Sequence, residues 1–153
     1  MLKKIIAALV MTFVLSACLT TMGGTHKAEA ATYHTKAIAV AKSNLGVRYL
    51  WGGTSRYGYD CSGLVYVSYR AAGKTLPRTA GEMALKGTTV SASSLRAGDL
   101  LFYNTGSTRG KVTHVAIYIG AGKMIHSSSS RGVSIISTSN SYWKPKFIRA
   151  KRI

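Results

Sequence analysis

The sequence predicts an α+β fold class, with N-terminal helices packed on an antiparallel C-terminal β-sheet. Helical patterns occupy the first part of the chain, and short apolar segments separated by Gly and Ser turns occupy the second part. Helices first and strands after is an order typical of α+β domains. The length of 153 residues and the lack of internal repeats indicate one domain.

The N-terminus has the features of a secretory signal. A basic start, Met1–Lys4, precedes the apolar run Ile5–Leu15, which is shorter than the roughly 20 apolar residues that a transmembrane helix needs. A buried N-terminal helix is the alternative interpretation. Leu15-Ser16-Ala17-Cys18 resembles a bacterial lipobox, which predicts a signal peptide over residues 1–18 and acylation of Cys18.

A second cleavage site competes with the lipobox. Ala28-Glu29-Ala30 suits an ordinary signal peptidase and would make residues 1–30 the signal peptide. We favour the lipobox because it lies directly against the apolar run, which leaves residues 19–34 as a spacer and residues 35–153 as the folded domain. Either site predicts an exported protein, lipid-anchored on the outer face of the cell membrane or secreted to the cell wall.

The first helix of the folded domain is expected over residues 34–45. This segment places Ala37, Ile38, Ala41 and Leu45 on one apolar face and ends at Gly46.

Two further helices are expected before the sheet. One begins at Cys61 behind the N-cap residue Asp60, is apolar on most faces and ends at Gly73, which predicts a buried helix. The segment Thr79–Glu82 has the spacing of a capping box and predicts a third helix that ends near Gly87.

The remaining apolar segments are expected to be the strands of the sheet. They are bounded by Gly and Ser turns and are rich in residues that favour extended structure. The strand segments are Asp99–Tyr103, Thr113–Ile119, Lys123–His126, Val133–Ile136 and Lys146–Ala150.

The chain has two cysteines, and only Cys61 lies in the predicted folded domain. Since Cys18 belongs to the lipobox or to a discarded signal, no disulfide is expected within the domain. A thiol in the first turn of a helix lies near unpaired N–H groups and the positive end of the helix dipole, and both favour the nucleophilic thiolate. The alternative interpretation of Cys61 is a small buried hydrophobic residue.

Two histidines are predicted to meet on one face of the sheet. If Ile119 pairs with Lys123 across the hairpin loop Gly120–Gly122, then His114 and His126 become diagonal neighbours. Such neighbours lie about 7–8 Å apart at the backbone, within reach of side chains. A register shift of one residue would place them on opposite faces.

This arrangement suits a proton relay to a cysteine nucleophile. His114 would act as the general base for Cys61, and His126 would hold the other ring nitrogen of His114 and fix its tautomer. Two satisfied polar residues near the core are the alternative interpretation. His26 and His34 lie in the signal or spacer region, and we assign them no role.

A zinc site is the other chemical interpretation of Cys61, His114 and His126. These residues provide three ligands, with neither a CxxC nor an HExxH motif and no fourth thiol or carboxylate nearby. A catalytic zinc would need only three, but we expect no metal and no cofactor.

The chain is strongly basic, with 21 Lys and Arg residues, four Asp and Glu residues and a formal net charge of +17. Such a surface attracts polyanions. Export argues against nucleic acid as a partner, whereas anionic lipid head groups and the anionic polymers of a bacterial wall suit an exported protein. A solvated surface without a dedicated partner is equally consistent with this charge, and we expect a monomer.

Several motifs occur in an order that resembles the NlpC-type cysteine peptidases. The resemblance covers about residues 35–150, nearly the whole folded domain. The motifs are Tyr49–Gly53, Asp60–Val65, Leu76–Thr79, Leu95–Leu100, His114–Gly120 and Met124–His126. It implies a reduced papain-like α+β domain and hydrolysis of peptide stems in bacterial peptidoglycan, often between γ-D-glutamate and a diamino acid.

The resemblance also implies roles for individual residues. It makes Cys61 the nucleophile, His114 the base and His126 the orienting third member. The Tyr49 hydroxyl would help to polarise the scissile carbonyl, together with the backbone N–H of Cys61.

Four further residues match positions that line the substrate groove of this family: Asp60, Ser62, Arg78 and Thr79. Asp60 would bind a free amino end of a stem peptide, and Arg78 would bind a stem carboxylate. The alternative roles are structural, with Asp60 as an N-cap, Ser62 as a first-turn residue and Thr79 as the capping-box hydroxyl. Met83 stands where many members of the family have glutamine.

The sequence therefore predicts an exported cysteine endopeptidase that cuts amide bonds in peptidoglycan stems. Two other functions stay open at this point. One is a non-catalytic envelope protein that uses the same groove and positive surface to bind wall polymer. The other is a hydrolase of a different γ-glutamyl polymer.

Overall fold

The computed structural model describes residues 22–153, so the predicted signal peptide over residues 1–18 and the predicted acylation site Cys18 lie outside the described residues. The chain divides into two units, residues 1–32 and residues 33–153, and the second unit contains the sheet and the site. Within residues 22–153, no helix combines the length and the apolar character that a membrane span requires.

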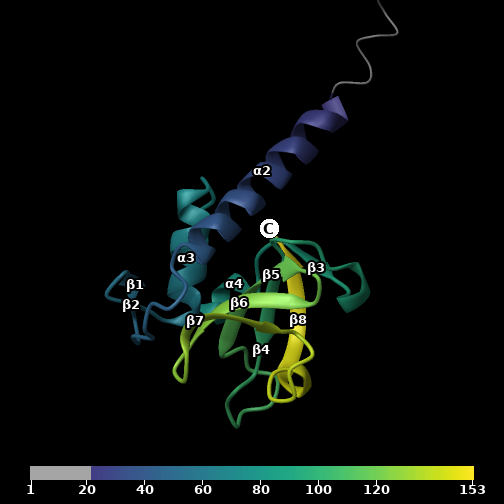
Figure 1. Cartoon of the computed structure of the whole chain (residues 1–153). Coiled ribbons are helices and arrows are strands. Elements are labelled where there is room, and N and C mark those ends of the chain that lie inside the picture. Colours follow the sequence, from purple (N-terminus) through teal and green to yellow (C-terminus); the bar gives the residue numbers. More distant parts are fainter. Residues whose placement is uncertain (1–21) are drawn as a thin grey trace, which may run out of the picture. The chain divides into compact units, whose positions relative to one another are not determined.

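The second unit is built on a six-stranded sheet in the order β3-β8-β4-β5-β6-β7, with every neighbouring pair antiparallel (Figure 1). Its strands are β3 (Thr88–Val90), β4 (Leu100–Tyr103), β5 (His114–Gly120), β6 (Lys123–Ser128), β7 (Gly132–Ser137) and β8 (Phe147–Arg152). The central strand β4 is buried along its whole length. The expected α+β fold class is confirmed, although β3 was not predicted from the sequence.

The N-terminal helix α2 spans Met22–Lys42, so the predicted start near residue 34 is wrong and part of the predicted spacer is helical. Ala37 and Ala41 are fully buried, as predicted, but Leu45 is 46% exposed. The chain leaves the helix before Leu45, and the N–H of Gly46 donates to the carbonyl of Val133. This tertiary contact, which the helical pattern cannot contain, turns Leu45 outward.

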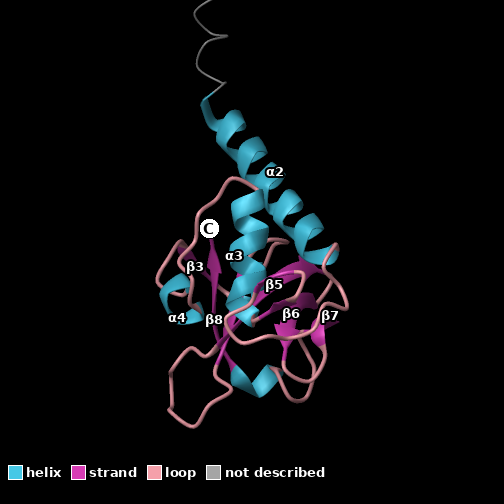
Figure 2. Ribbon diagram, turned by 90° about the vertical axis from the view of Figure 1, so that its left-hand side faces the viewer, coloured by secondary structure: helices cyan, strands magenta, loops and turns pink. Residues whose placement is uncertain are grey.

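Helix α3 (Cys61–Ala71) confirms the predicted buried helix. The carboxylate of its N-cap residue Asp60 accepts a 2.6 Å hydrogen bond from the N–H of Gly63, and Gly73 follows the helix in a left-handed conformation with φ of 86°. Leu64 and Val65 are fully buried. The helix packs against β5 and β6 and so places its first turn beside the sheet (Figure 2).

Helix α4 (Ala80–Met83) confirms the predicted capping box but ends at Met83, earlier than the predicted end near Gly87. Thr79 accepts from the N–H of Glu82, and the Glu82 side chain accepts from the N–H of Thr79. Two 3₁₀ helices, η1 (Ala92–Ser94) and η2 (Lys144–Lys146), lie in later connections.

A small hairpin, β1 (Thr54–Ser55) and β2 (Gly58–Tyr59), precedes α3. Tyr49 forms an isolated bridge with Tyr59, which ties the Tyr49–Gly53 turn to the residue two positions before Cys61. The hairpin thereby holds this turn beside the start of α3.

The register of the β5–β6 hairpin brings the two histidines together as predicted, but its turn differs. Ile117 pairs with Ile125 and Tyr118 with Met124, whereas Gly120 pairs with Lys123 across an irregularity after Tyr118. The predicted pairing of Ile119 with Lys123 is therefore wrong. The connection has two residues, both with positive φ, Ala121 at 50° and Gly122 at 68°. A two-residue turn of this kind suits the twist of a hairpin.

Candidate active site

The candidate active site is a pocket of about 1010 Å³ between the start of α3 and the sheet. Its walls come from the turn over residues 49–52, the first turn of α3, residues 78–81, the connection between β4 and β5, the start of β5, the strand β6 with the turn after it, and the connection between β7 and β8. It gathers every residue for which the sequence predicted a catalytic or substrate-binding role: Tyr49, Asp60, Cys61, Ser62, Arg78, Thr79, His114 and His126.

The two predicted histidines form a direct hydrogen bond. Nε2 of His114 lies 3.0 Å from Nδ1 of His126, and the rings are nearly perpendicular, at 86°. Both side chains are buried, with 6% of His114 and 1% of His126 exposed. The prediction that these residues share one face of the sheet is confirmed.

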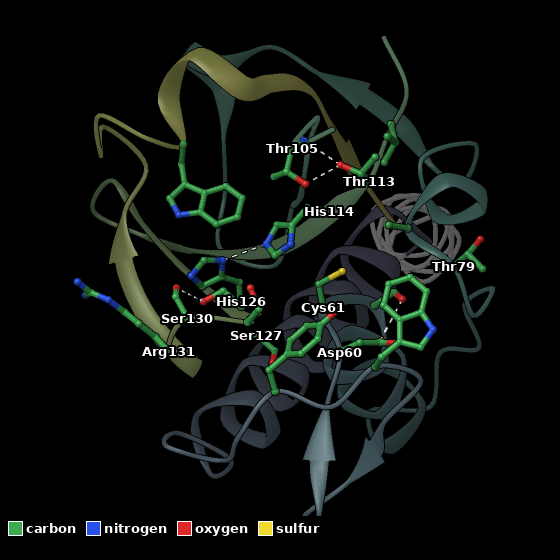
Figure 3. Close-up of a pocket in the computed structure, with 18 of the residues that line it drawn as sticks. Asp60, Cys61, Thr79, Thr105, Thr113, His114, His126, Ser127, Ser130 and Arg131 are labelled. Carbon is green, nitrogen blue, oxygen red and sulfur yellow. Dashed lines mark hydrogen bonds between the residues drawn. The ribbon is translucent and has the colours of Figure 1, made fainter. Parts of the chain in front are cut away.

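The hydrogen bond decides which nitrogen of His114 can serve Cys61. Since Nε2 is engaged with His126, Nδ1 is the nitrogen left to accept a proton from a thiol. For Nδ1 to accept, Nε2 must carry the hydrogen and donate it to Nδ1 of His126. Figure 3 shows the side chains of Cys61 and His114 pointing into the same pocket, one from the start of α3 and one from β5.

The protonation of Cys61 differs from the prediction. Burial raises the pKa of the Cys61 thiol, and nearby Asp60 raises it further. Backbone N–H groups of Val115, Ser62 and Cys61 itself oppose this effect but do not overcome it. The expectation that the helix start keeps Cys61 as a thiolate is therefore wrong for the free protein, because desolvation of the sulfur exceeds the help of the helix N-terminus.

Burial acts on the two imidazoles in the opposite direction. It lowers the pKa of His114 to about 3, with a further contribution from His126. It lowers the pKa of His126 to about 4, with a further contribution from the cationic Arg131. At neutral pH the resting site therefore holds a neutral thiol and two neutral imidazoles.

Asp60 and Arg78 form an ion pair in the wall of the pocket. Nη1 of Arg78 donates to Oδ1 of Asp60 at 2.9 Å, and Nη2 donates to Oδ2 at 2.7 Å. Arg78 also donates to the hydroxyl of Ser62 at 2.8 Å, and the N–H of Gly52 donates to Asp60 at 2.9 Å. Asp60 is thus the predicted N-cap and also a junction of the site, and hydrogen bonding to Asp60 raises the pKa of Arg78.

Tyr49 and Thr79 both line the pocket. Burial raises the pKa of the Tyr49 hydroxyl, and Cys61 and Asp60 raise it further, so the group is a neutral donor at neutral pH. The hydroxyl of Thr79 donates to the Glu82 carboxylate at 2.6 Å, within the predicted capping box.

The structure adds residues to which the sequence assigned no role in the site. Among them are the aromatic residues Trp51, Tyr142 and Trp143 and the basic residues Lys111 and Arg131. Trp51 is 85% exposed and belongs to a motif that the sequence had singled out. The others come from irregular connections, where no periodic pattern shows which way a side chain points. Within residues 22–153, no three His, Cys, Asp or Glu side chains gather to hold a metal ion.

The chain matches known proteins across this region. The NlpC/P60 family model matches residues 46–152. The chain is 38% identical, over 109 residues, to the gamma-D-glutamyl-L-lysine dipeptidyl-peptidase of Bacillus subtilis (strain 168), a match that covers 71% of this chain and 37% of that protein. It is 45% identical, over 109 residues, to the murein DD-endopeptidase MepS/murein LD-carboxypeptidase of Escherichia coli (strain K12), covering 71% of this chain and 56% of that protein.

A solved structure agrees with the sequence matches. The crystal structure of an NlpC/P60 family protein from Bacillus cereus ATCC 10987 superposes with a TM-score of 0.74 and 38% identity, covering 78% of this chain and 39% of that chain. This chain therefore spans about a third to a little over half of the length of these relatives. The resemblance drawn from the motifs is confirmed, and this chain belongs to the NlpC/P60 family.

Proposed function

We propose that this protein is an exported cysteine endopeptidase that hydrolyses amide bonds in peptidoglycan stem peptides, at the bond between γ-D-glutamate and the diamino acid. The observation that carries the proposal is the 3.0 Å hydrogen bond between His114 and His126 in the pocket that also contains Cys61. A nucleophile, a base and a residue that orients the base are the parts that thiol-dependent amide hydrolysis requires.

The reaction begins from a neutral thiol. As the Cys61 sulfur bonds to the scissile carbonyl carbon, its proton passes to Nδ1 of His114, and the resulting imidazolium returns that proton to the leaving amine as the C–N bond breaks. Water then hydrolyses the thioester and regenerates the thiol. His126 keeps the Nε2 hydrogen of His114 engaged throughout, so Nδ1 stays available to exchange a proton with the sulfur.

The negative charge on the carbonyl oxygen needs donors beside the sulfur. The N–H of Cys61 is available at the helix start, and Tyr49 lines the same pocket with a neutral hydroxyl. We assign these two groups to the oxyanion.

The charges of the pocket favour an anionic peptide. Asp60, the acidic residue of the lining, is already paired with Arg78. Lys111 and Arg131 form no ion pair within residues 22–153, so they are available for the carboxylates of a stem peptide. Asp60, Ser62, Arg78 and Thr79 also line the pocket and are assigned to substrate binding.

The two relatives named above differ in the bond that their names specify. One name specifies the γ-D-glutamyl-L-lysine unit, and the other specifies a DD-endopeptidase. Digestion of purified stem peptides and cross-linked dimers, followed by mass spectrometry, separates these bonds. We expect cleavage after γ-D-glutamate, and its loss in Cys61→Ala. Cleavage of the DD cross-link alone would move the assignment to that bond.

The same digestion, repeated with poly-γ-glutamate and combined with sedimentation of the protein with cell wall, separates the proposal from its rivals. A wall-binding protein without activity would leave every stem peptide intact while still sedimenting with the wall. A hydrolase of another γ-glutamyl polymer would release fragments from poly-γ-glutamate and not from stem peptides. Either result would overturn the proposed function.

Export and attachment are part of the proposal. The predicted lipobox supports a lipid anchor at Cys18, and the net charge of +17 supports attraction to anionic wall polymers. We expect Cys18→Ser to move the protein from the membrane fraction to the medium.

Wall binding is tested with the inactive variant Cys61→Ala, which leaves the wall intact. We expect this variant to dissociate from purified cell wall at about 0.5 M salt, because charges are then screened within a few ångströms. Retention of Cys18→Ser in the membrane fraction would contradict the lipid anchor, and wall binding that does not weaken with salt would contradict the attraction to anionic wall polymers.

A further inference from the structure

Trp143 lies against both imidazoles of the site. Its ring centroid is 4.4 Å from that of His114, with an interplanar angle of 34°, so the two rings are stacked face to face with a tilt. It is 4.9 Å from that of His126, at 78°, so this second contact is edge-on. The indole therefore contacts both partners of the hydrogen bond that carries the proposed function (Figure 3 shows the two histidines).

Backbone hydrogen bonds in the connection between β7 and β8 fix the main chain of Trp143. Its backbone N–H donates to the backbone carbonyl of Asn140 at 3.1 Å, and its backbone carbonyl accepts from the backbone N–H of Lys146 at 3.0 Å. The ring makes a T-shaped contact with Tyr103, at 5.4 Å between centroids, and packs against the core cluster that contains Tyr103. One side of the indole is thus anchored on the core while the other meets the imidazoles.

We propose that Trp143 is a positioning residue that keeps the His114–His126 pair aligned and stabilises the positive charge that His114 acquires during acylation. This inference rests on the proposed function, since the charge arises when His114 takes the proton of Cys61. Trp143 touches the base and its partner, and it acts on the reaction through them.

The charge on His114 has little other support from its neighbours. Burial disfavours a positive charge on both imidazoles, His126 disfavours it further on His114, and Arg131 in the turn after β6 disfavours it further on His126. Tyr103 on β4 makes a T-shaped contact with His114 at a longer centroid distance, 6.2 Å against 4.4 Å for Trp143, and Cys61 on α3 is neutral until it gives up its proton. An indole face stacked on an imidazolium attracts it through the ring quadrupole, and tryptophan is the strongest of the aromatic residues in this interaction.

A purely structural role for Trp143 is the alternative, and Phe147 provides a matched control. Phe147 packs on the same Tyr103 ring, at 5.8 Å, and against the same core cluster. In the part of the chain that the structure describes, no ring contact joins it to His114 or His126. Trp143→Leu and Phe147→Leu therefore both remove an aromatic ring from one core, and only the first removes it from the base.

The first test is the steady-state hydrolysis of stem peptides by Trp143→Leu, Trp143→Phe and Phe147→Leu. We expect Trp143→Leu to lower kcat about tenfold with KM changed less than about twofold, Trp143→Phe to lower it about threefold, and Phe147→Leu to stay near the wild-type value. Equal losses of kcat in Trp143→Leu and Phe147→Leu, or a loss confined to KM, would overturn the proposal. If Trp143→Leu does not fold, Trp143→Phe against Phe147→Leu carries the same comparison.

The second test does not depend on the substrate. Alkylation of Cys61 by iodoacetamide at neutral pH requires the thiol to give its proton to His114, so its rate reports the thiolate–imidazolium pair. We expect Trp143→Leu to react about tenfold more slowly than the wild-type protein, with Phe147→Leu unchanged. An equal or faster rate in Trp143→Leu would overturn the role of Trp143. A wild-type protein that alkylates as expected but cleaves no stem peptide would instead overturn the proposed function.

Discussion

At the level of single residues, the site is controlled by the burial of its ionisable groups. Burial raises the pKa of Cys61 and lowers that of His114 to about 3. A thiolate–imidazolium pair is thus disfavoured in the free protein, and the proton has to move as the sulfur attacks. Catalysis then depends on the orientation of the His114 ring, which the hydrogen bond to His126 fixes.

The two histidines are expected to differ in what their loss costs. His114→Ala removes the base, and we expect kcat to fall at least about a thousandfold. His126→Ala leaves the base in place but frees its ring, and we expect a smaller loss, on the order of a hundredfold. Steady-state kinetics on one stem peptide checks this order. A larger loss in His126→Ala would contradict the roles assigned here.

Asp60 combines two functions that a pair of substitutions can separate. Asn at this position keeps an N-cap acceptor for the N–H of Gly63 but lacks the charge that pairs with Arg78, whereas Ala lacks both. We expect Asp60→Ala to be less stable than Asp60→Asn by about 1 kcal/mol, measured by urea denaturation. Both should raise KM, since Arg78 loses its partner. Equal stability of the two variants would mean that the cap contributes nothing.

At the level of elements, the position of Cys61 depends on how closely α3 approaches the turn before it. A Cβ atom at Gly63 would lie 2.0 Å from the carbonyl oxygen of Gly53 and 2.8 Å from Oδ1 of Asp60. A glycine in the first turn of α3 therefore lets the helix start pack directly on the turn that carries Tyr49. The nucleophile and the proposed oxyanion donor are held together by this contact.

Gly63→Ala is expected to disturb both the fold and the site. The backbone has to shift to admit the methyl group, and we expect a loss of about 3 kcal/mol in the free energy of unfolding, together with a fall in kcat. Gly81→Ala in α4 is the control, because its Cβ would meet nothing closer than the carbonyl oxygen of Val112 at 4.0 Å. Denaturant unfolding checks both variants. A Gly63→Ala variant with unchanged stability would contradict the close approach of α3 to the Gly53 carbonyl.

At the level of the whole molecule, the buried histidine pair links stability to pH. The folded-state pKa values, about 3 for His114 and about 4 for His126, lie below the ordinary value of 6.5. Between pH 6.5 and these folded-state values, each histidine binds more protons in the unfolded chain than in the folded one. The stability that the neutral pair contributes is therefore fully present above about pH 6.5 and is lost as the pH falls through about 4 for His126 and about 3 for His114.

The size of this effect can be measured by removing the titrating groups. Each histidine contributes a slope of up to about 1.4 kcal/mol per pH unit in this window. We expect the double variant His114→Gln, His126→Gln to show a flatter dependence of the free energy of unfolding on pH between about 4 and 6. Urea denaturation at several pH values checks this. Parallel profiles for the two proteins would mean that other groups cause the acid sensitivity.

The sequence by itself determined the fold class, the buried helix behind Asp60, the capping box at Thr79 and the shared face of His114 and His126. These features follow from local periodicity, capping chemistry and strand parity, which a few neighbouring residues express. The family motifs pointed to the same set of residues.

Only the tertiary structure decided the protonation of those residues and their contacts with distant parts of the chain. The pKa of Cys61 is set by desolvation from segments distant in the chain, and this reverses the effect expected from its helix position. The outward turn of Leu45 and the stacking of Trp143 on His114 likewise depend on contacts between remote elements. Burial and ring contacts arise from packing, and no local pattern of residues contains them.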